Sequence, residues 1–313
     1  MSLDFKKFEY IISFKYITSV TFKHKKKFDD LAIVLVTYKT TVGTINKIVE
    51  KIPKEIQVLI TENSKNIFFK KKIERKFKNV TILIPKNNLG NGGGINFCIN
   101  NSDKKYYFYL DIDTCFEKSF IKNFFLRSIN LKNWAIAAPA IKDYNYPNKD
   151  FNEKLEKDIW VMNRIIGCAL LFNAKEFKEI GFYDENIFLF FEEDDIFEKL
   201  KINNKRIILL KSEIIKHIGN NSAYKKRDIL RIEMLKNWHL MWSKFYFYNK
   251  YKGKIFAYLI TIKQFISSFL KMLILLLLGN KEKATIYKYR FDGLLSAYTG
   301  KKSYKRINNI KLI

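Results

Sequence analysis

Short apolar runs alternate along this chain with amphipathic or polar segments, and the alternation predicts strands and helices in turn. Residues 31–37 (LAIVLVT) and 106–110 (YYFYL) are unbroken apolar and aromatic runs of strand length, typical of strands buried on both faces. The same patterns predict further strands at residues 57–61, 80–84, 134–139 and 206–210, and helices at residues 42–51, 64–76 and 120–129. Strands that alternate with helices indicate an α/β fold with a parallel sheet and crossover helices.

The C-terminal third follows another pattern. Residues 255–278 are apolar with five polar interruptions, which share one stripe of a helix. The interruptions are Lys263, Gln264, Ser267, Ser268 and Lys271. Such a helix is typical of one lying in the plane of a membrane interface, and residues 272–278 are too short an unbroken run to cross a bilayer alone. A tilted spanning helix whose lysines reach the interface is the alternative.

Charge divides the chain into three parts. The 313 residues carry a net charge of +27. Residues 223–313 contain 20 Lys and Arg against 4 Asp and Glu, and residues 1–28 contain 7 against 2, so the middle is much closer to neutral. We therefore predict a basic flank at residues 1–28, an α/β domain at residues 29–222 and a basic helical region at residues 223–313. Basic ends favour an anionic partner, either phospholipid headgroups or nucleic acid.

The cysteines and the N-terminus bear on the cellular compartment. Cys98, Cys115 and Cys168 are odd in number and have no cysteine or histidine close by in the sequence. They indicate neither a disulfide framework nor a zinc site, and they favour a reducing compartment. Lysines and a glutamate interrupt the first 15 residues, so we expect no secretion by a cleaved signal peptide.

Two carboxylates, Asp111 and Asp113, directly follow the buried run at residues 106–110. Acids at positions i and i+2 after a strand can approach one hard cation and leave coordination positions for substrate phosphates. Parallel sheets bind ligands outside the carboxyl ends of their strands, which is where these acids are expected. The alternative is an acidic turn with a structural role only.

A glycine-rich segment, residues 87–96 (NNLGNGGGIN), precedes the same strand. Glycine lets the backbone approach a ligand closely or adopt a positive φ, and here it opens a predicted helix. The segment fits neither the GxGxxG dinucleotide pattern nor a Walker loop. A flexible glycine turn is the alternative interpretation.

Four consecutive acids, residues 192–195, follow an aromatic run. The helix dipole favours acids in a first helical turn, but crowding also raises carboxylate pKa values, which suits a general base. His217 follows the last predicted strand and lies near Gly219 in the sequence, so it is a second candidate. We also predict a long polar loop at residues 142–157, of a kind that is often functional.

Taken in chain order, these motifs resemble those of the family 2 glycosyltransferases, especially the bacterial rhamnosyltransferase-like and galactofuranosyltransferase-like members. The resemblance covers residues 29–222. The matching segments are VTYK (36–39) for the family's VTYN, TENS (61–64) for VDNS, NLGNGGGIN (88–96) for NLGFAGGxN, DID (111–113) for DxD, FLFFEEDDI (188–196) for FLYFEDxDL and HIGNNS (217–222) for HxGxS. The resemblance implies a GT-A fold with a Rossmann-like, mostly parallel sheet.

The same resemblance implies an inverting transfer of a sugar from a nucleoside-diphosphate sugar to an acceptor hydroxyl. Asp113 and His217, helped by Asp111, would bind Mg²⁺ or Mn²⁺. The implied nucleotide-sugar-binding residues are Thr37, Tyr38, Glu62, Asn63, Asn88, Gly90, Gly93, Asn96 and Asp111. Glu62 stands where the family has Asp, so the identity of the nucleobase stays open.

Glu193 stands in the position of the family's catalytic base, where Asp is usual. Glutamate is an equivalent proton acceptor but places its carboxylate farther from the backbone. Asp194 and Asp195 are therefore alternative bases. An inactive relative that only binds the nucleotide-sugar is the corresponding alternative function.

The expected partners follow from the resemblance and the charge. We expect a lipid-linked or cell-surface glycan acceptor and peripheral attachment to the anionic cytoplasmic face of the inner (plasma) membrane. A nucleic-acid-binding protein would have to place phosphates beside the acids at the strand ends, so we expect no nucleic acid. A sugar-1-phosphate nucleotidyltransferase would need glycines after the first strand, where residues 38–42 have none. The oligomeric state is open, a homo-oligomer included.

Overall fold

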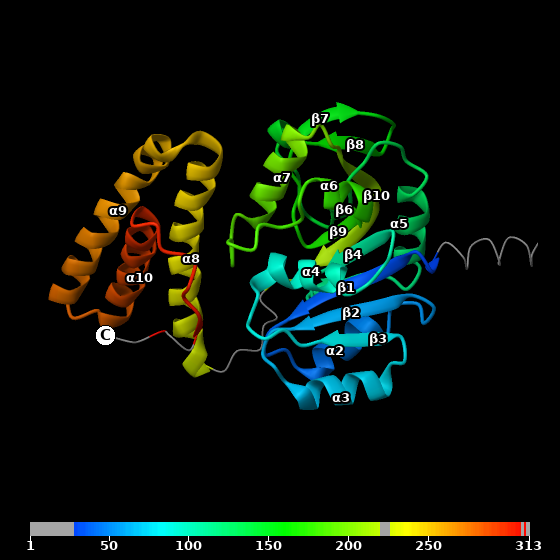
Figure 1. The fold of residues 1–313 in the computed structure, drawn as a ribbon, viewed down its shortest axis with the longest axis horizontal. Helices are drawn as coiled ribbons and strands as arrows, with labels where there is room; N and C mark the ends of the chain where they lie inside the picture. Colours follow the sequence, from blue (N-terminus) through cyan, green and yellow to red (C-terminus); the bar gives the residue numbers. More distant parts are fainter. Residues whose placement is uncertain (1–27, 220–225, 308–309, 311–313) are drawn as a thin grey trace, which may run out of the picture.

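A computed structural model describes residues 28–219, 226–307 and 310. The first of these ranges folds around one sheet (Figure 1). Its elements are β1 (Leu31–Thr37), α2 (Val42–Val49), β2 (Gln57–Glu62), α3 (Ile67–Lys76), β3 (Val80–Leu83), α4 (Gly90–Asn100), β4 (Tyr106–Leu110), β5 (Thr114–Cys115), α5 (Phe120–Ser128), β6 (Ile136–Ile141), η1 (Asn148–Asp150), β7 (Phe151–Lys154), β8 (Ile159–Met162), β9 (Ala169–Asn173), α6 (Ala174–Glu179), α7 (Glu192–Ile202) and β10 (Ile207–His217). The basic flank predicted for residues 1–28 lies, apart from Phe28, outside the described residues.

The strands follow the order β3-β2-β1-β4-β9-β6-β10-β8-β7, and β5 pairs with β10. The β3-β2-β1-β4 half is parallel, as the alternating pattern predicts. The other half is mixed, because β9 runs antiparallel to both β4 and β6, and β7 and β8 form an antiparallel pair. From β1, the strands β2 and β3 follow on one side of the sheet and β4 on the other. Open α/β sheets bind ligands at such a switch point in strand order.

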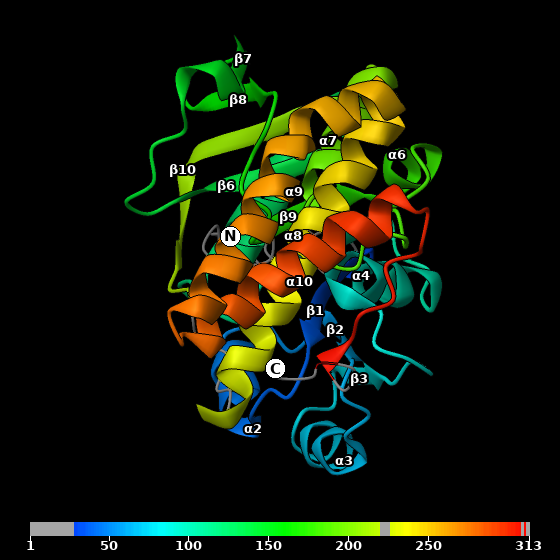
Figure 2. The same cartoon turned by 90° about the vertical axis from the view of Figure 1, so that its left-hand side faces the viewer.

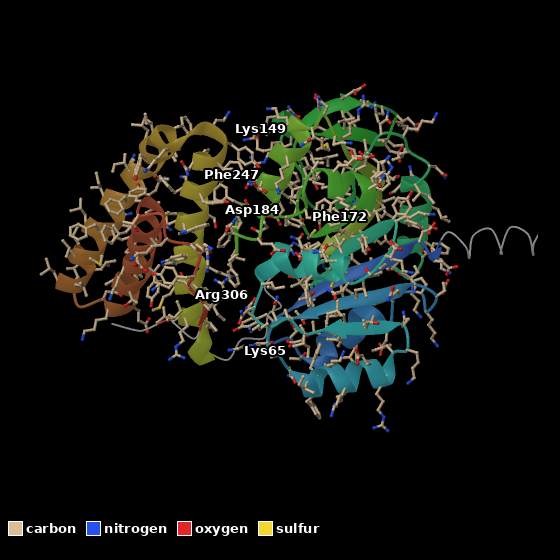
Figure 3. The ribbon with its side chains drawn as sticks, in the orientation of Figure 1. Lys65, Lys149, Phe172, Asp184, Phe247 and Arg306 are labelled. Atoms are coloured by element: carbon tan, nitrogen blue, oxygen red, sulfur yellow. The ribbon has the colours of Figure 1, made fainter. Side chains whose placement is uncertain are left out.

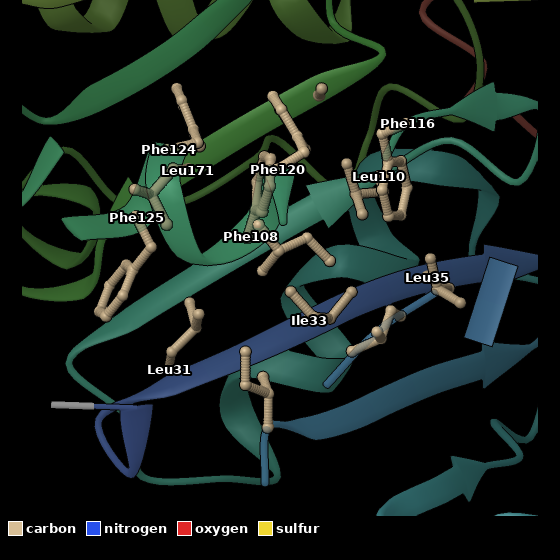
Figure 4. Close-up of a cluster of buried hydrophobic side chains, with 14 of the residues drawn as sticks. Leu31, Ile33, Leu35, Phe108, Leu110, Phe116, Phe120, Phe124, Phe125 and Leu171 are labelled. Atoms are coloured by element: carbon tan, nitrogen blue, oxygen red, sulfur yellow. The ribbon is translucent and has the colours of Figure 1, made fainter. Parts of the chain in front are cut away.

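Helices cover both faces of the sheet. Alternate residues of β1 point to opposite faces: Leu31, Ile33 and Leu35 pack in one apolar cluster, whereas Ala32 and Val34 belong to the other. The first cluster lies under α2, α3 and α5, and Figure 4 shows its phenylalanines around β1 and β4. The second lies under α4, α6 and α7. Burial on both faces explains the unbroken apolar run of this strand.

The prediction of a polar loop at residues 142–157 is wrong in part, because this segment contains η1 and the edge strand β7. Within β7, Phe151 packs edge-on against Trp160 of β8, with ring centroids 5.0 Å apart. The next residues of β7 are exposed and polar. An edge strand with one apolar anchor has too little hydrophobic patterning to be distinguished from a loop.

Three long helices, α8 (Lys226–Lys252), α9 (Lys254–Leu277) and α10 (Lys281–Tyr298), form a separate helical unit. Figures 1 and 2 show α8 as the helix nearest the sheet domain and α9 on the outside. The helical unit is tied to the sheet domain through Asp184, which accepts hydrogen bonds from Tyr246 Oη at 2.9 Å and Lys250 Nζ at 2.7 Å. Figure 3 shows Asp184 at this junction.

Candidate active site

A cavity of about 300 Å³ opens at the carboxyl ends of β1 and β4, where chain order reverses in the sheet. It is lined by residues from the strand ends, the glycine-rich segment, the segment before α7 and the helical unit. These residues are Val36, Thr37, Tyr38, Thr40, Asn63, Asn88, Gly90, Asn91, Tyr109, Asp111, Ile112, Asp113, Phe188, Leu189, Ile232, Leu235, Lys236 and Ile307. The location agrees with the expectation from parallel-sheet topology.

Asp111, Asp113 and His217 come together at the edge of this cavity. β10 continues past a register shift near Ile214, and its end pairs with β5 so that His217 lies opposite Thr114. This pairing brings His217 Nε2 to 3.1 Å from Asp113 Oδ1 and 3.6 Å from Asp111 Oδ2. One ligand atom from each of the three side chains lies within 4.8 Å of the others. Two carboxylates and an imidazole suit a divalent cation such as Mn²⁺ or Mg²⁺.

The Asp111 carboxyl has an unusual environment. Burial raises its pKa to about 7, opposed by the hydrogen bond from Tyr109 and reinforced by the charge of Asp113. The Tyr109 hydroxyl also lies 2.9 Å from Asn91 Oδ1, and the backbone N–H of Asp111 donates to the Cys168 carbonyl at 2.8 Å. Asp111 is therefore held in place, and a cation would compete with its proton near neutral pH.

The glycine-rich segment runs into the first turns of α4 and is tightly packed rather than flexible. Gly90 has a φ of +76°, and a Cβ there would lie 2.1 Å from the Phe188 carbonyl oxygen. A Cβ on Gly94 would lie 2.8 Å from Val36. Asn63, at the end of β2, accepts from Leu89 N at 3.0 Å and donates to the Gly90 carbonyl at 3.1 Å. These contacts hold the start of α4 against the ends of β1 and β2.

The structure brings only some of the predicted nucleotide-sugar residues to the cavity. The lining ones are Thr37, Tyr38, Asn63, Asn88, Gly90 and Asp111. Glu62, Gly93 and Asn96 are not among the residues that line it. Glu62 accepts from Ser64 Oγ at 2.6 Å and Asn66 N at 2.7 Å, which shapes the turn before α3. The Asn96 side-chain amide donates a hydrogen bond to the Tyr183 carbonyl and accepts one from the Tyr183 backbone N–H.

The acids of residues 192–195 begin α7 after a strained backbone. Phe190 and Phe191 both have left-handed φ values, 64° and 67°, which cost roughly 1–2 kcal/mol each for residues with a Cβ. Strain of this kind concentrates at functional sites. Glu192 and Glu193 follow, and burial raises the pKa of both carboxyls. Glu193 lies close enough to Asp111 to raise the pKa of that residue as well.

The two aspartates of the run make ion pairs away from the cavity. Asp194 pairs with Arg164, and both line a different cavity beside α7. Asp195 is 0 % exposed and pairs with Lys199 at 3.1 Å and Lys250 at 2.5 Å. Tyr251 Oη also donates to Asp195 at 2.8 Å. These contacts fasten α7 to α8. None of the four acids is among the residues that line the cavity, but Glu193 lies close enough to Asp111 in the cavity wall to affect its pKa.

Gly167 makes room for the Glu193 side chain. A Cβ on Gly167 would lie 2.3 Å from Glu193 Oε1 and 2.7 Å from its Cγ. We expect Gly167→Ala to leave the fold intact, since a flexible side chain can move, but to displace the carboxylate. A misplacement of about 1 Å can cost about 10²-fold in rate. The measurement is kcat, which should fall by about 10²-fold. The donor KM and the melting temperature should stay near their wild-type values.

Gly43→Ala is the matched control, because the nearest atom to its Cβ would be 3.9 Å away. This variant should keep the wild-type kcat. A Gly167→Ala enzyme with wild-type kcat would show that the position of Glu193 is not important for turnover.

Sequence reasoning missed several lining residues. Tyr109 carried a signal, since side chains at i and i+2 of a strand share a face and Tyr109 is two residues before Asp111. Asn91 lies inside the glycine-rich motif, but its residue type alone gives no sign of a contact with the cavity. The α8 residues and Ile307 carried no signal, because their place depends on how the helical unit packs.

Comparisons with known proteins bear on the fold. No profile of a known protein family matches the sequence, and no curated protein has a matching sequence. The structure is similar to that of GalNAc-T7 with UDP, GalNAc and Mn²⁺, with a TM-score of 0.53 and 12% identity over 72% of this chain and 51% of that chain. It is also similar to the mannosyltransferase PcManGT from Pyrobaculum calidifontis in complex with GDP-Man and Mn²⁺, with a TM-score of 0.53 and 10% identity over 86% of each chain.

These similarities show the fold. The chain has a GT-A glycosyltransferase fold, with the sheet domain flanked by helices and an apolar helix in its C-terminal region. The fold class predicted from the sequence is thus confirmed. This chain spans about half the length of GalNAc-T7 and most of the length of the mannosyltransferase.

Proposed function

We propose that this protein is an inverting, metal-dependent glycosyltransferase. It transfers a sugar from a nucleoside-diphosphate sugar to a hydroxyl of a lipid-linked or cell-surface glycan. The observation that carries the proposal is the Asp111, Asp113 and His217 group at the edge of a cavity walled by β1, β4 and α4. The metal and nucleotide in the two similar structures support it.

The proposed chemistry assigns a role to each part of the site. Asp111, Asp113 and His217 would hold Mn²⁺ or Mg²⁺, and the bound cation would supply positive charge against the leaving diphosphate. Asn63 keeps the start of α4 against the strand ends, where the nucleotide would lie. Glu193 would accept the proton of the acceptor hydroxyl as its oxygen attacks the anomeric carbon from the face opposite the diphosphate. General-base assistance is typically worth about 10² to 10⁴ in rate.

The experiment for the class of reaction is a donor panel. Purified protein is incubated with UDP-, GDP- and dTDP-sugars and Mn²⁺, and the release of the nucleoside diphosphate by slow hydrolysis is followed. We expect release from one nucleotide class. Absence of release and of binding for every donor would contradict the proposal.

We propose further that the helical unit attaches the protein peripherally to the cytoplasmic face of the inner membrane. Among the described residues, α9 alone is long and apolar enough to cross a membrane by its length and composition. Its large side chains point outward, with Leu259 70 % and Leu277 88 % exposed, while Thr261 and Ser268 are buried in the unit. Small and polar residues inside and large apolar residues outside are typical of a surface that faces lipid.

The polar stripe of α9 is divided between two environments. Ser268 is buried against the rest of the helical unit, whereas Lys263 and Lys271 are exposed. The lysines therefore border the apolar face, where they can meet anionic headgroups. This arrangement supports a helix lying in the interface, with its inner side occupied by α8 and α10.

We expect the full-length protein to float with anionic vesicles and to be only partly released by high salt. Salt screens the lysines but not the buried leucines. Replacing Leu259 and Leu277 by Glu should abolish flotation, and alkaline carbonate should extract the wild-type protein. Protein that resists carbonate, with its C-terminus protected from protease on one side, would instead show that α9 spans the bilayer.

A further inference from the structure

The helical unit forms one wall of the candidate active site. Ile232, Leu235 and Lys236 of α8, together with Ile307, line the cavity that also contains Asp111 and Asp113 in its wall. Figures 1 and 2 show α8 passing beside the strand ends. The catalytic domain expected at residues 29–222 therefore does not enclose the cavity by itself.

This wall is fixed to the sheet domain by polar contacts that lie farther along α8, C-terminal to the lining residues. Ser243 Oγ donates to the Leu189 carbonyl at 2.9 Å, and Lys250 Nζ donates to the buried Asp195 at 2.5 Å. The segment after α10 is also anchored, since the Arg306 guanidinium lies 3.7 Å from the ring centroid of Phe188. Figure 3 shows Arg306 between the helical unit and the sheet domain. The position of α8 against the cavity is thus set by the folded structure.

Lys236 is the only cationic side chain among the described residues that line this cavity. No hydrogen bond or ion pair joins it to any other described residue. The acidic groups of the same lining, Asp111 and Asp113, already lie beside His217. Lys236 is exposed to solvent, and an exposed lysine without a partner beside this cavity is available to an anionic ligand.

We infer that Lys236 binds the diphosphate of the donor, so that the helical unit supplies part of the donor site. The inference rests on the proposed function. A nucleoside diphosphate brings at least two negative charges. The two positive charges of a divalent cation are already balanced by the carboxylates of Asp111 and Asp113. Uncompensated negative charge beside the strand ends is unfavourable, and Lys236 reduces it from the α8 wall of the cavity. Its ammonium also stabilises the charge that develops on the leaving group.

The test is the affinity for UDP, GDP and dTDP in the presence of Mn²⁺, measured by calorimetry, with the matching nucleosides as a second set of ligands. We expect Lys236→Ala to weaken binding of the preferred nucleoside diphosphate by about 10- to 100-fold, the usual range for a hydrogen bond to a charged group. Binding of the nucleoside, which has no phosphate, should not change. Lys236→Arg should retain most of the diphosphate affinity because it keeps the charge.

Lys252→Ala is the matched control, since Lys252 is an exposed lysine on the same helix and lines a different cavity. This variant should bind as the wild type does. Wild-type affinity in Lys236→Ala would overturn the inference, and so would an equal loss for nucleoside and diphosphate, which would indicate a collapsed cavity. If the wild-type protein binds none of the three diphosphates with Mn²⁺, the proposed function fails, and the inference fails with it.

Discussion

Asp113→Asn is expected to abolish sugar transfer and Mn²⁺-dependent nucleotide binding while the melting temperature stays near that of the wild type. Asp113 and His217 approach to 3.1 Å, and an amide is a poor substitute for a charged oxygen ligand. Since a catalytic metal contributes several kcal/mol to transition-state stabilisation, the rate should fall by about 10³-fold or more. Transfer rates and Mn²⁺ titrations of the variant measure both effects.

The same titration has a pH dependence. The pKa of Asp111 is raised to about 7, so below that pH the carboxyl is increasingly protonated and Mn²⁺ must displace the proton. Apparent Mn²⁺ affinity should therefore decrease as the pH falls below about 7.

For the Asp113→Asn experiment, Asp103→Asn is the control for a change of surface charge alone, because Asp103 is an exposed acid. Wild-type activity of Asp113→Asn in excess chelator would remove the metal from the mechanism.

Glu193→Gln should lower kcat by about 10² or more with little loss of donor binding, because a proton acceptor acts mainly in the transition state. The variant keeps the size of the side chain beside Gly167, so the fold and the cavity should be preserved. Steady-state kinetics with a defined acceptor separate the effect on kcat from that on donor KM.

Asp195→Asn distinguishes the two acids. Asp195 is buried and ion-paired with Lys199 and Lys250, so its replacement should lower the melting temperature more than it changes the chemistry. Loss of turnover in Asp195→Asn at wild-type stability, together with a nearly wild-type Glu193→Gln, would identify Asp195 as the base and contradict the assignment to Glu193.

The sheet domain could be predicted largely because its strands are buried on both faces. The apolar runs at β1 and β4 have the length and residue types of buried strands, and the predicted helices correspond to α2, α3 and α5 within a few residues. The acids at the end of β4 are local in sequence, so their position at the strand end followed directly. The strands β7, β8 and β9 were not predicted, and β7 resembles a loop because it is an edge strand with one packed aromatic residue.

The rest of the candidate site depends on contacts between distant parts of the chain. His217 reaches Asp113 only because β10 continues past a register shift and pairs with β5. Glu62 and Asn96 have the residue types of ligand-binding positions, yet both form local or structural hydrogen bonds. Lys236 lines the cavity because α8 is fastened to Asp184 and Asp195. No local pattern in the sequence indicates how α8 packs, whereas His217 was predicted through the resemblance of residues 217–222 to the HxGxS segment.

The most direct test of the account is where the cation and the nucleotide bind. Crystals grown with Mn²⁺ and the nucleoside diphosphate released in the donor panel can be measured at a wavelength where manganese scatters anomalously. The account predicts one strong peak within coordination distance of Asp113 and His217, with the diphosphate between that peak and Lys236. A manganese peak at another place, or a nucleotide bound in another cavity, would contradict the assignment of this site.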